Sequence, residues 1–253
     1  MAGRVVILLV LLLFAGCGAF GGAERQTVTP VPVPEQPQDS RAASAVTENT
    51  VDARRLAAAH RRATWNRSYV LGMRLSLEWG TQIVNLVVED RYHYQFRTEI
   101  LDQNYTKRVY TNGNRRYVYD KRAQGAWTAT RQPTPVSGVL DPDPARLIEA
   151  YLATNVSVER PRDDCDTCRV TLTATDPPAA FEPADNYSAR ATVRPDGLVR
   201  SLTVSYWDRS RNSLVSYEIR YSAVGETTVS RPTWVRKRWG NATDSDPELS
   251  DSQ

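Results

Sequence analysis

Histidine, cysteine and methionine are scarce in this chain. The 253 residues include two histidines, three cysteines and two methionines. A four-ligand zinc site would need more cysteine or histidine than the Cys165–Cys168 pair and two distant histidines supply. The motifs GxSxG, HExxH, the Walker loop and GxGxxG are also absent from the sequence. We therefore expect no catalysis, no cofactor and no metal ion.

The two histidines favour structural roles over acid–base chemistry. His60 falls on the apolar face of an expected helix, which is typical of a residue packed in a core. His93 alternates with Tyr92 and Tyr94, so on a strand its side chain would point away from both rings toward the surface. An enzyme that uses His60 as a general base remains the alternative interpretation.

No apolar run in the sequence is long enough to cross a bilayer. The run Val5–Phe14 has ten residues, whereas a hydrocarbon core of ~30 Å needs roughly 20. Arg4 precedes this run and two small residues lead from it into Cys17, a pattern typical of a secretory signal with a lipid-attachment cysteine. The sequence therefore predicts a signal peptide at 1–16 and a lipid anchor on Cys17 that holds the protein on the outer face of the cell membrane. Alternatively, Cys17 is only the residue at which the apolar run stops.

Two further segments have little that could form a core. Residues 17–46 contain four prolines and few large apolar side chains, which predicts an extended linker behind the lipid anchor. Residues 240–253 carry four carboxylates and no basic residue, which predicts an acidic disordered tail. Residues 47–239 remain as one folded domain.

Positive charge exceeds negative charge in the expected domain. The whole chain carries a net charge of +3 even though its last segment is acidic, so the domain is more basic than the chain. The basic residues occur as scattered pairs, such as Arg54-Arg55 and Arg115-Arg116, rather than as one stripe. We therefore expect a solvated surface. Attraction to anionic lipid headgroups or to an acidic surface layer is the alternative.

Two features beyond the leader indicate an exported protein. Cys165 and Cys168 precede a strand-like alternation, so outside the cell we expect a structural disulfide between them. Redox chemistry and half of a zinc site are the alternatives for this pair. Asn-x-Ser/Thr triplets are more frequent than chance, which predicts N-glycosylation. The five candidate asparagines are Asn66, Asn104, Asn155, Asn186 and Asn241.

Alternation of apolar and polar residues with a period of two recurs along most of the domain. One clear run is 69–79, and Asn112-Gly113 marks a hairpin turn. Helical spacing instead follows Asn49 or Thr50, either of which could cap a helix, and a second helix is expected after its cap at Asp143. The sequence therefore predicts an α+β fold, in which a large curved antiparallel sheet of about nine to eleven strands carries two helices on one face.

The chain resembles a family of envelope lipoproteins. Its lipid-attachment cysteine, proline-rich spacer, leading helix and long hairpins are similar to haloarchaeal lipoproteins of unknown function. The domain resembles, in outline, lipoprotein carriers of the LolA and LppX type. Three details carry the likeness, which covers roughly residues 47–235: Asp52-Ala53 with His60, Pro195-Asp196-Gly197, and Arg231-Pro232-Thr233-Trp234. None is a catalytic motif, so the resemblance implies a fold and not an activity.

One face of the expected sheet is rich in apolar and aromatic side chains. Beneath two helices such a face could hold an acyl or isoprenoid chain, although the helices themselves could also fill it. The candidate ligand-binding residues are Met73, Leu75, Leu77, Trp79, Tyr92, Tyr94 and Phe96. We interpret the protein as a membrane-anchored carrier of a lipid or other apolar molecule, without nucleic acid as a partner. The alternative is a structural or interaction lipoprotein of the archaeal envelope that has no small ligand.

Overall fold

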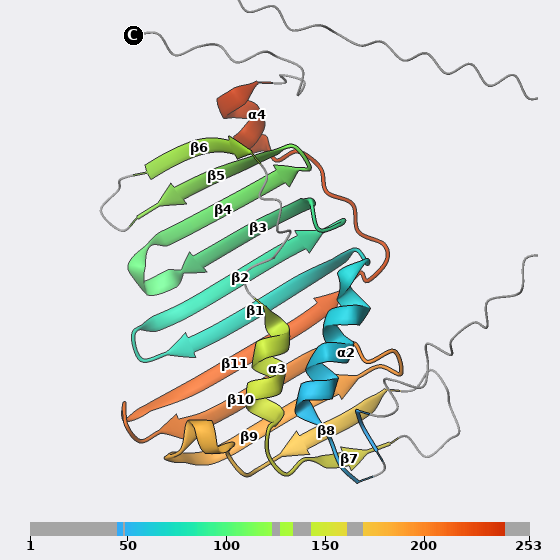
Figure 1. The fold of residues 1–253 in the computed structure, drawn as a ribbon. Helices are drawn as coiled ribbons and strands as arrows, with labels where there is room; N and C mark the ends of the chain where they lie inside the picture. The colour runs from blue at the N-terminus through green and yellow to red at the C-terminus, as the bar shows by residue number, and fades with distance from the viewer. Residues whose placement is uncertain (1–44, 48, 123–126, 134–142, 161–168, 241–253) are drawn as a thin grey trace, which may run out of the picture. The chain divides into compact units, whose positions relative to one another are not determined.

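Eleven strands form one antiparallel sheet in the computed structural model, which describes residues 45–47, 49–122, 127–133, 143–160 and 169–240. In space the strands follow the order β6-β5-β4-β3-β2-β1-β11-β10-β9-β8-β7 (Figure 1). Their bounds are β1 Tyr69–Leu77, β2 Gly80–Val88, β3 His93–Ile100, β4 Tyr105–Asn112, β5 Arg115–Lys121, β6 Trp127–Pro133, β7 Ser157–Glu159, β8 Val170–Ala174, β9 Ala184–Val193, β10 Val199–Asp208 and β11 Ser213–Ser222.

The strand order consists of two meanders that meet in the middle of the sheet. Strands β1 to β6 proceed outward in one direction, and β11 back to β7 proceed outward in the other. The first and last strands are therefore neighbours, with Leu71 opposite Tyr221 and Leu75 opposite Tyr217. This arrangement confirms the predicted α+β class with an antiparallel sheet, and the strand count lies at the upper end of the predicted range. The three-residue strand β7 was not predicted.

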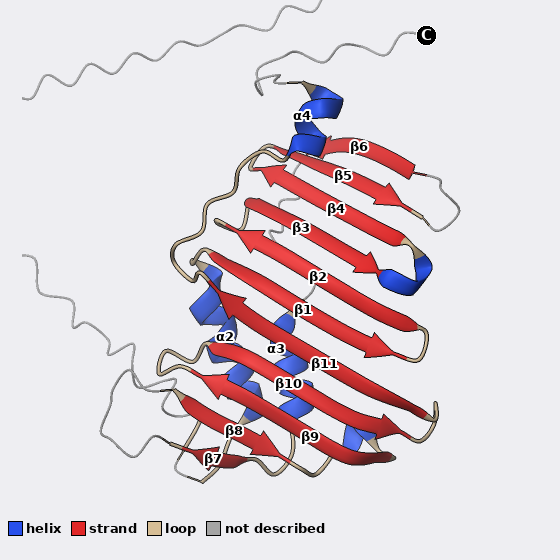
Figure 2. Ribbon diagram, turned by 180° about the vertical axis from the view of Figure 1, so that it is seen from behind, coloured by secondary structure: helices blue, strands red, loops and turns tan. Residues whose placement is uncertain are grey.

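Three helices accompany the sheet in the described part of the chain: α2 Ala53–Trp65, α3 Pro144–Leu152 and α4 Thr233–Trp239. Helices α2 and α3 lie on the same face, which the view from behind shows on the far side of the strands (Figure 2). These are the two predicted helices. Helix α4 was not predicted, because its seven residues are too few to show a clear helical period.

The cap of α2 differs from the prediction. Asp52 is the N-cap, and its carboxylate accepts a hydrogen bond from the Arg55 backbone N–H at 3.0 Å. The two residues expected to cap the helix stand before this point, where the Thr50 hydroxyl is 2.6 Å from that of Thr47. The predicted cap of α3 is confirmed, because the Asp143 carboxylate accepts from the backbone N–H of Ala145 at 3.1 Å.

The main hydrophobic core lies between the sheet and helices α2 and α3. Alternate residues of the central strands point into it, and Leu71, Leu202 and Ile219 are fully buried there. Ala45 and Val46 also belong to this core, so packing begins slightly before the expected start of the domain at residue 47. The intervening residues of the strands face the other side of the sheet, where Ser, Thr and Arg predominate.

A second, smaller core joins α4 to the opposite face. Val235 is fully buried against Tyr110 of β4 and Tyr117 of β5, which are paired across the two strands. The segment between β11 and α4 reaches this end of the sheet along the ends of the strands (Figure 2). On the way the Val229 N–H donates to the Glu89 carboxylate at 2.9 Å, and the Gln95 amide donates to the Ser230 carbonyl oxygen at 2.6 Å.

Candidate ligand-binding cleft

An apolar cleft of about 270 Å³ opens on the helix-covered face, between α3 and the middle of the sheet. Its walls come from four strands and one helix, because the register places side chains of neighbouring strands side by side. Met73 lies opposite Val84, and Leu75 lies opposite both Gln82 and Tyr217. The lining residues are Met73, Leu75, Gln82, Val84, Phe96, Leu147 and Tyr217.

The cleft lies at the border of the surface that the helices cover. In Figure 1, α3 crosses β11, β10 and β9, while β3 to β6 extend beyond both helices. Leu147, in the first turns of α3, is half-buried and closes one side of the cleft. The Asp143 cap fixes where α3 begins, and an ion pair of 2.8 Å between Arg61 and Asp143 ties that end to α2.

An aromatic cluster anchors the other end of α3 and the wall beside the cleft. The ring of Tyr151 stacks on Phe181 at 4.7 Å between centroids and lies 5.7 Å from that of Tyr217. The Tyr187 hydroxyl donates to the Tyr151 carbonyl oxygen at 2.5 Å. Phe181 in turn lies 5.7 Å from Tyr206. These aromatic side chains therefore pack against one another beside the cleft.

Two polar groups interrupt the apolar lining. The Gln82 amide donates to the Thr98 hydroxyl at 3.1 Å. The Tyr217 hydroxyl is buried, and among the described residues it has no hydrogen-bond partner. Burial, followed by the proximity of Tyr151, raises the pKa of Tyr217 well above its ordinary value, so the hydroxyl keeps its proton. A buried donor without a partner costs about 1–3 kcal/mol unless a ligand atom or water accepts from it.

The predicted ligand-binding residues divide into two groups. Met73, Leu75 and Phe96 line the cleft, and Leu77 and Tyr94 are half-buried beside the same core. These five share the helix-covered face, as the alternation predicted. Whether they bind a ligand stays a prediction.

Trp79 and Tyr92 lie in turns and are not among the residues that line the cleft. Trp79 is in the turn between β1 and β2 and is 48% exposed. Tyr92 is in the turn before β3, where the Arg91 guanidinium stacks 4.6 Å from its ring centroid. Both runs of alternation end in a tight turn, and a turn residue no longer follows the strand period.

The sequence did not indicate four of the lining residues: Gln82, Val84, Leu147 and Tyr217. Gln82 and Val84 follow the same alternation, but Gln82 is polar and gives no signal of a binding face. Leu147 and Tyr217 belong to segments about 70 and 140 residues farther along the chain, and only the tertiary fold brings them to β1. Pairing of β11 with β1 places Tyr217 opposite Leu75.

His60 is a buried structural residue at the junction of α2 with the sheet. Its Nδ1 accepts from the Val199 backbone N–H at 3.2 Å, and its Nε2 lies 3.0 Å from the Tyr221 hydroxyl. Burial lowers the pKa of His60 to about 4, an effect that the charge of Asp143 partly opposes. The predicted core position of His60 is therefore confirmed.

His93 is more exposed, and its Nδ1 lies 2.7 Å from a carboxylate oxygen of Asp90. This histidine also lies against the turn between β4 and β5. A Cβ atom added to Gly113 would stand 2.9 Å from its Nε2. Among the described residues, no three His, Cys, Asp or Glu side chains gather into a group that could hold a metal ion.

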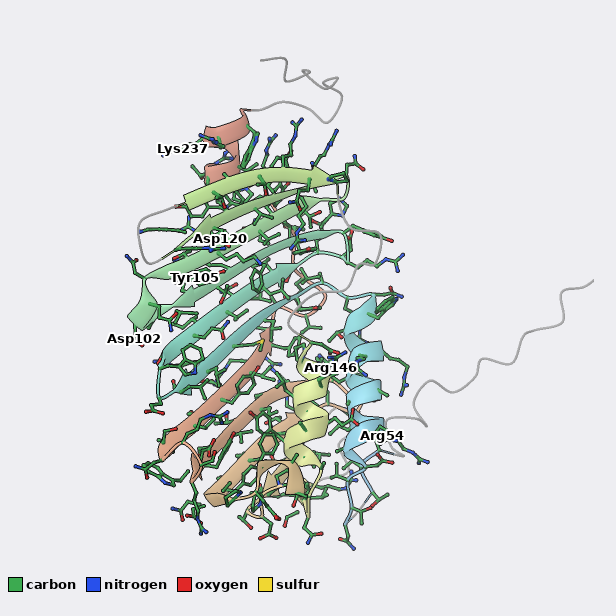
Figure 3. All side chains as sticks on the ribbon, turned by 60° about the vertical axis from the view of Figure 1, so that its left-hand side comes forward. Arg54, Asp102, Tyr105, Asp120, Arg146 and Lys237 are labelled. Atoms are coloured by element: carbon green, nitrogen blue, oxygen red, sulfur yellow. The ribbon has the colours of Figure 1, made fainter. Side chains whose placement is uncertain are left out.

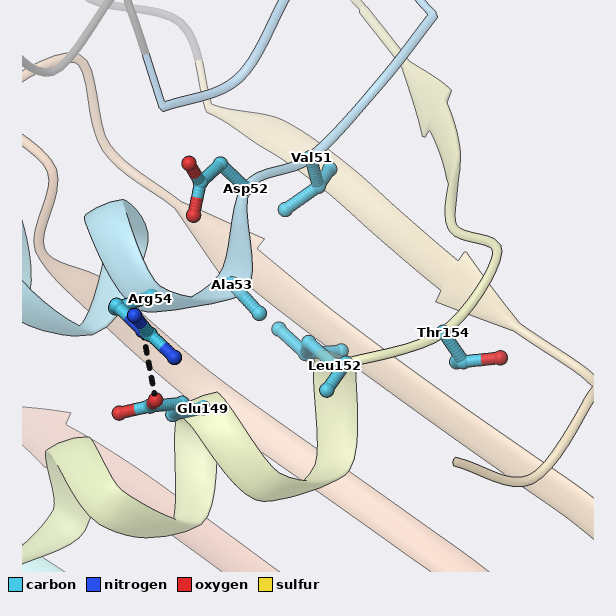
Figure 4. Close-up of a pocket in the computed structure, with 8 residues that line it drawn as sticks. Val51, Asp52, Ala53, Arg54, Glu149, Leu152 and Thr154 are labelled. Atoms are coloured by element: carbon cyan, nitrogen blue, oxygen red, sulfur yellow. Dashed lines mark ion pairs between the residues drawn. The ribbon is translucent and has the colours of Figure 1, made fainter. Parts of the chain in front are cut away.

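Two other hollows have a different character. One lies between the first turn of α2 and the last turn of α3, has a volume of about 530 Å³, and is spanned by an ion pair of 3.5 Å between Arg54 and Glu149 (Figure 4). The other lies on the opposite face beside Trp234 and measures about 450 Å³. Arginine and carboxylate side chains border both, so neither offers the apolar lining of the first cleft.

Several predicted sites fall outside the described residues. Cys17, Cys165, Cys168 and Asn241 are among them. The four other candidate glycosylation residues are all exposed: Asn66, Asn104, Asn155 and Asn186. No helix in the described part of the chain is long and apolar enough to span a bilayer.

Comparisons with known proteins add little to this geometry. No protein-family model matches the chain, and a search of curated proteins finds no match. Among solved structures, the chain is weakly similar to MucB in its crystal structure with MucA(peri). The identity is 8%, the TM-score is 0.14, and the match covers 68% of this chain and 94% of that chain. The fold class therefore depends on the helices and strands of this chain alone.

Proposed function

We propose that the protein binds one apolar chain, such as the acyl chain of a lipid, in the cleft between α3 and the sheet. The observation that carries this proposal is an open space of about 270 Å³ lined mainly by apolar side chains, next to the main hydrophobic core. The volume is slightly below the ~300–1,000 Å³ of typical small-molecule pockets. A single narrow chain suits such a cleft better than a bulky ring system does.

The Tyr217 hydroxyl suggests how the ligand is oriented. It is a protonated donor in an apolar wall and has no partner among the described residues. A carboxylate, ester or other oxygen at one end of the ligand would accept from it and remove the cost of the unpaired donor. We infer that the ligand is amphiphilic, with its chain against Met73 and Phe96 and its oxygen at Tyr217.

The predicted lipid anchor and linker suggest where in the cell the protein acts. A lipid anchor on Cys17 and the linker at 17–46 would hold the domain at the outer membrane–water boundary, where lipids are available. Binding and transport need no chemical step, so we propose a carrier and not an enzyme.

Titration of the full chain with saturated fatty acids of increasing length tests the proposal. Each methylene that enters the cleft contributes ~0.8 kcal/mol, so affinity should rise about fourfold per methylene until the cleft is full. Leu147→Trp fills the cleft and should abolish binding. Leu214→Trp makes the same change at a leucine that is 59% exposed on the opposite face, and should leave binding intact.

A second variant separates the polar from the apolar contribution. Tyr217→Phe keeps the ring and removes the unpaired hydroxyl, so we expect weaker binding of fatty acids and unchanged binding of alkanes of equal length. If Leu147→Trp and Tyr217→Phe both bind like the wild type, the cleft is not the binding site. If the wild type binds no member of the series, a structural or interaction role without a small ligand is favoured instead.

A further inference from the structure

Basic residues gather at one end of the sheet, although along the sequence they occur as scattered pairs. Strands β4, β5 and β6 are consecutive at this end, and α4 packs against the first two. These elements and the residues beside them contain eleven lysines and arginines but one carboxylate, Asp120. We call this set the basic end; it consists of Lys107, Arg108, Arg115, Arg116, Lys121, Arg122, Arg131, Arg231, Arg236, Lys237 and Arg238.

The rest of the described domain is nearly neutral. It holds seventeen basic residues and sixteen carboxylates, and many of these are paired, as are Arg67 and Asp196 at 2.6 Å. Two members of the basic end, Arg231 and Arg238, have interactions of their own. Among the described residues, the other nine form no ion pair within 4.0 Å of a carboxylate. The excess positive charge of the domain is therefore concentrated in one place.

Helix α4 presents this charge outward. Val235 is fully buried beneath it, whereas Arg236, Lys237 and Arg238 are exposed. Lys237 stands at the far end of the domain from Arg54 on α2 (Figure 3). Trp234 and Trp239 stand near the two ends of the helix and are half-buried, with ring centroids 6.1 Å apart. An indole with one apolar side and one N–H group suits a membrane–water boundary.

We propose that the basic end docks on an anionic lipid surface. Like charges that have no counter-ion repel one another, and a surface of anionic headgroups relieves that repulsion at many points at once. We favour lipid over nucleic acid because of the indoles beside the charge and because of the membrane tether at Cys17; to that extent this inference rests on the proposed function. The linker at 17–46 would let the domain turn this end toward the membrane.

Two triple variants of the full chain test the docking surface. The first replaces three exposed residues of the basic end: Arg131→Gln, Arg236→Gln and Lys237→Gln. The control, Arg62→Gln, Arg74→Gln and Arg190→Gln, removes the same charge from exposed residues elsewhere, and none of the six forms an ion pair with a described residue. The apolar leader is identical in both chains, so its affinity for lipid cancels in the comparison.

Binding is measured by co-sedimentation with phosphatidylcholine vesicles, with and without phosphatidylglycerol. A basic residue near an anionic surface contributes about fivefold to binding, so the first variant should bind the anionic vesicles at least tenfold more weakly than the wild type. The control should change much less, added salt should weaken wild-type binding, and neutral vesicles should not distinguish the variants.

Three results would overturn the inference. Equal losses in both variants would mean that total charge, and not the basic end, drives binding. Unchanged binding in the first variant would mean that these charges do not bind lipid. They would then serve to prevent the edge strand β6 from pairing with other chains. Tighter binding of a short DNA duplex than of anionic vesicles would identify nucleic acid as the partner. Fatty-acid titration measures binding in the cleft and does not depend on the vesicle experiment. A negative vesicle result would therefore not decide whether the cleft binds an apolar chain.

Discussion

The protonation of His60 gives the sharpest prediction for stability. Its pKa is about 4 in the folded chain, whereas an exposed histidine titrates near 6.5. Between these values the unfolded chain binds more protons than the folded chain, so the free energy of unfolding falls as pH falls. The contribution of His60 to the free energy of unfolding is complete well above pH 6.5. It declines by about 1.4 kcal/mol at pH 5.5 and by about 2.5 kcal/mol at pH 4.5.

Denaturant unfolding of the full chain at pH values from 7.5 to 4.5 measures this loss. The same series on His60→Gln removes the titrating group, so the pH dependence of that variant should be flatter by about 2.5 kcal/mol over the range. The carboxyl groups with lowered pKa values, Asp90 and Asp196 among them, are present in both chains, so their contribution cancels in the comparison. A parallel decline in both chains would refute the assignment.

Proton NMR gives an independent reading, since the chain has only two histidines. His93→Gln identifies the remaining signal as that of His60. We expect no titration of this signal above pH 5. A midpoint near 6.5 would show that the ring is solvated and that its contacts with Val199 and Tyr221 do not persist.

Four further substitutions test particular contacts, each by denaturant unfolding. Asp52→Ala should cost about 1 kcal/mol, because the first turn of α2 loses its capping acceptor; no cost would mean that the helix starts elsewhere. Gly113→Ala should cost about 1 kcal/mol or more, since φ is +91° there and the new methyl group would meet His93. Gly72→Ala, with open space at its Cβ position, should instead be neutral or stabilising by about 0.5 kcal/mol. Leu71→Ala should cost about 2–5 kcal/mol because the side chain is fully buried.

Alternation along the chain was sufficient to predict most strands and their inward faces. Met73, Leu75 and Phe96 lie where a period of two places them, because a sheet with one covered face needs apolar residues at every second position. The hairpin at Asn112-Gly113 and the turn at Pro195-Asp196-Gly197 are also present, with positive φ at both glycines. Local chemistry determines these features, so they can be read from short segments.

Features that depend on distant segments could not be predicted in this way. Helix α4 is short, and the contacts of Val235 with two tyrosines more than 110 residues away stabilise it. The basic end has the same origin. Its pairs, such as Arg115-Arg116 and Lys237-Arg238, are separated along the chain and meet only because α4 returns to β4 and β5. The scattered pairs did not indicate this clustering, and the expectation of a merely solvated surface stays a prediction.

The most direct test of the cleft as a binding site is native mass spectrometry of the full chain recovered from cells that produce it. We expect the wild-type protein to carry one additional apolar molecule beyond its covalent modifications. Leu147→Trp should lack it, and Leu214→Trp should retain it. Wild-type protein that is empty in repeated preparations, or a molecule retained equally by both variants, would contradict a carrier function for this cleft.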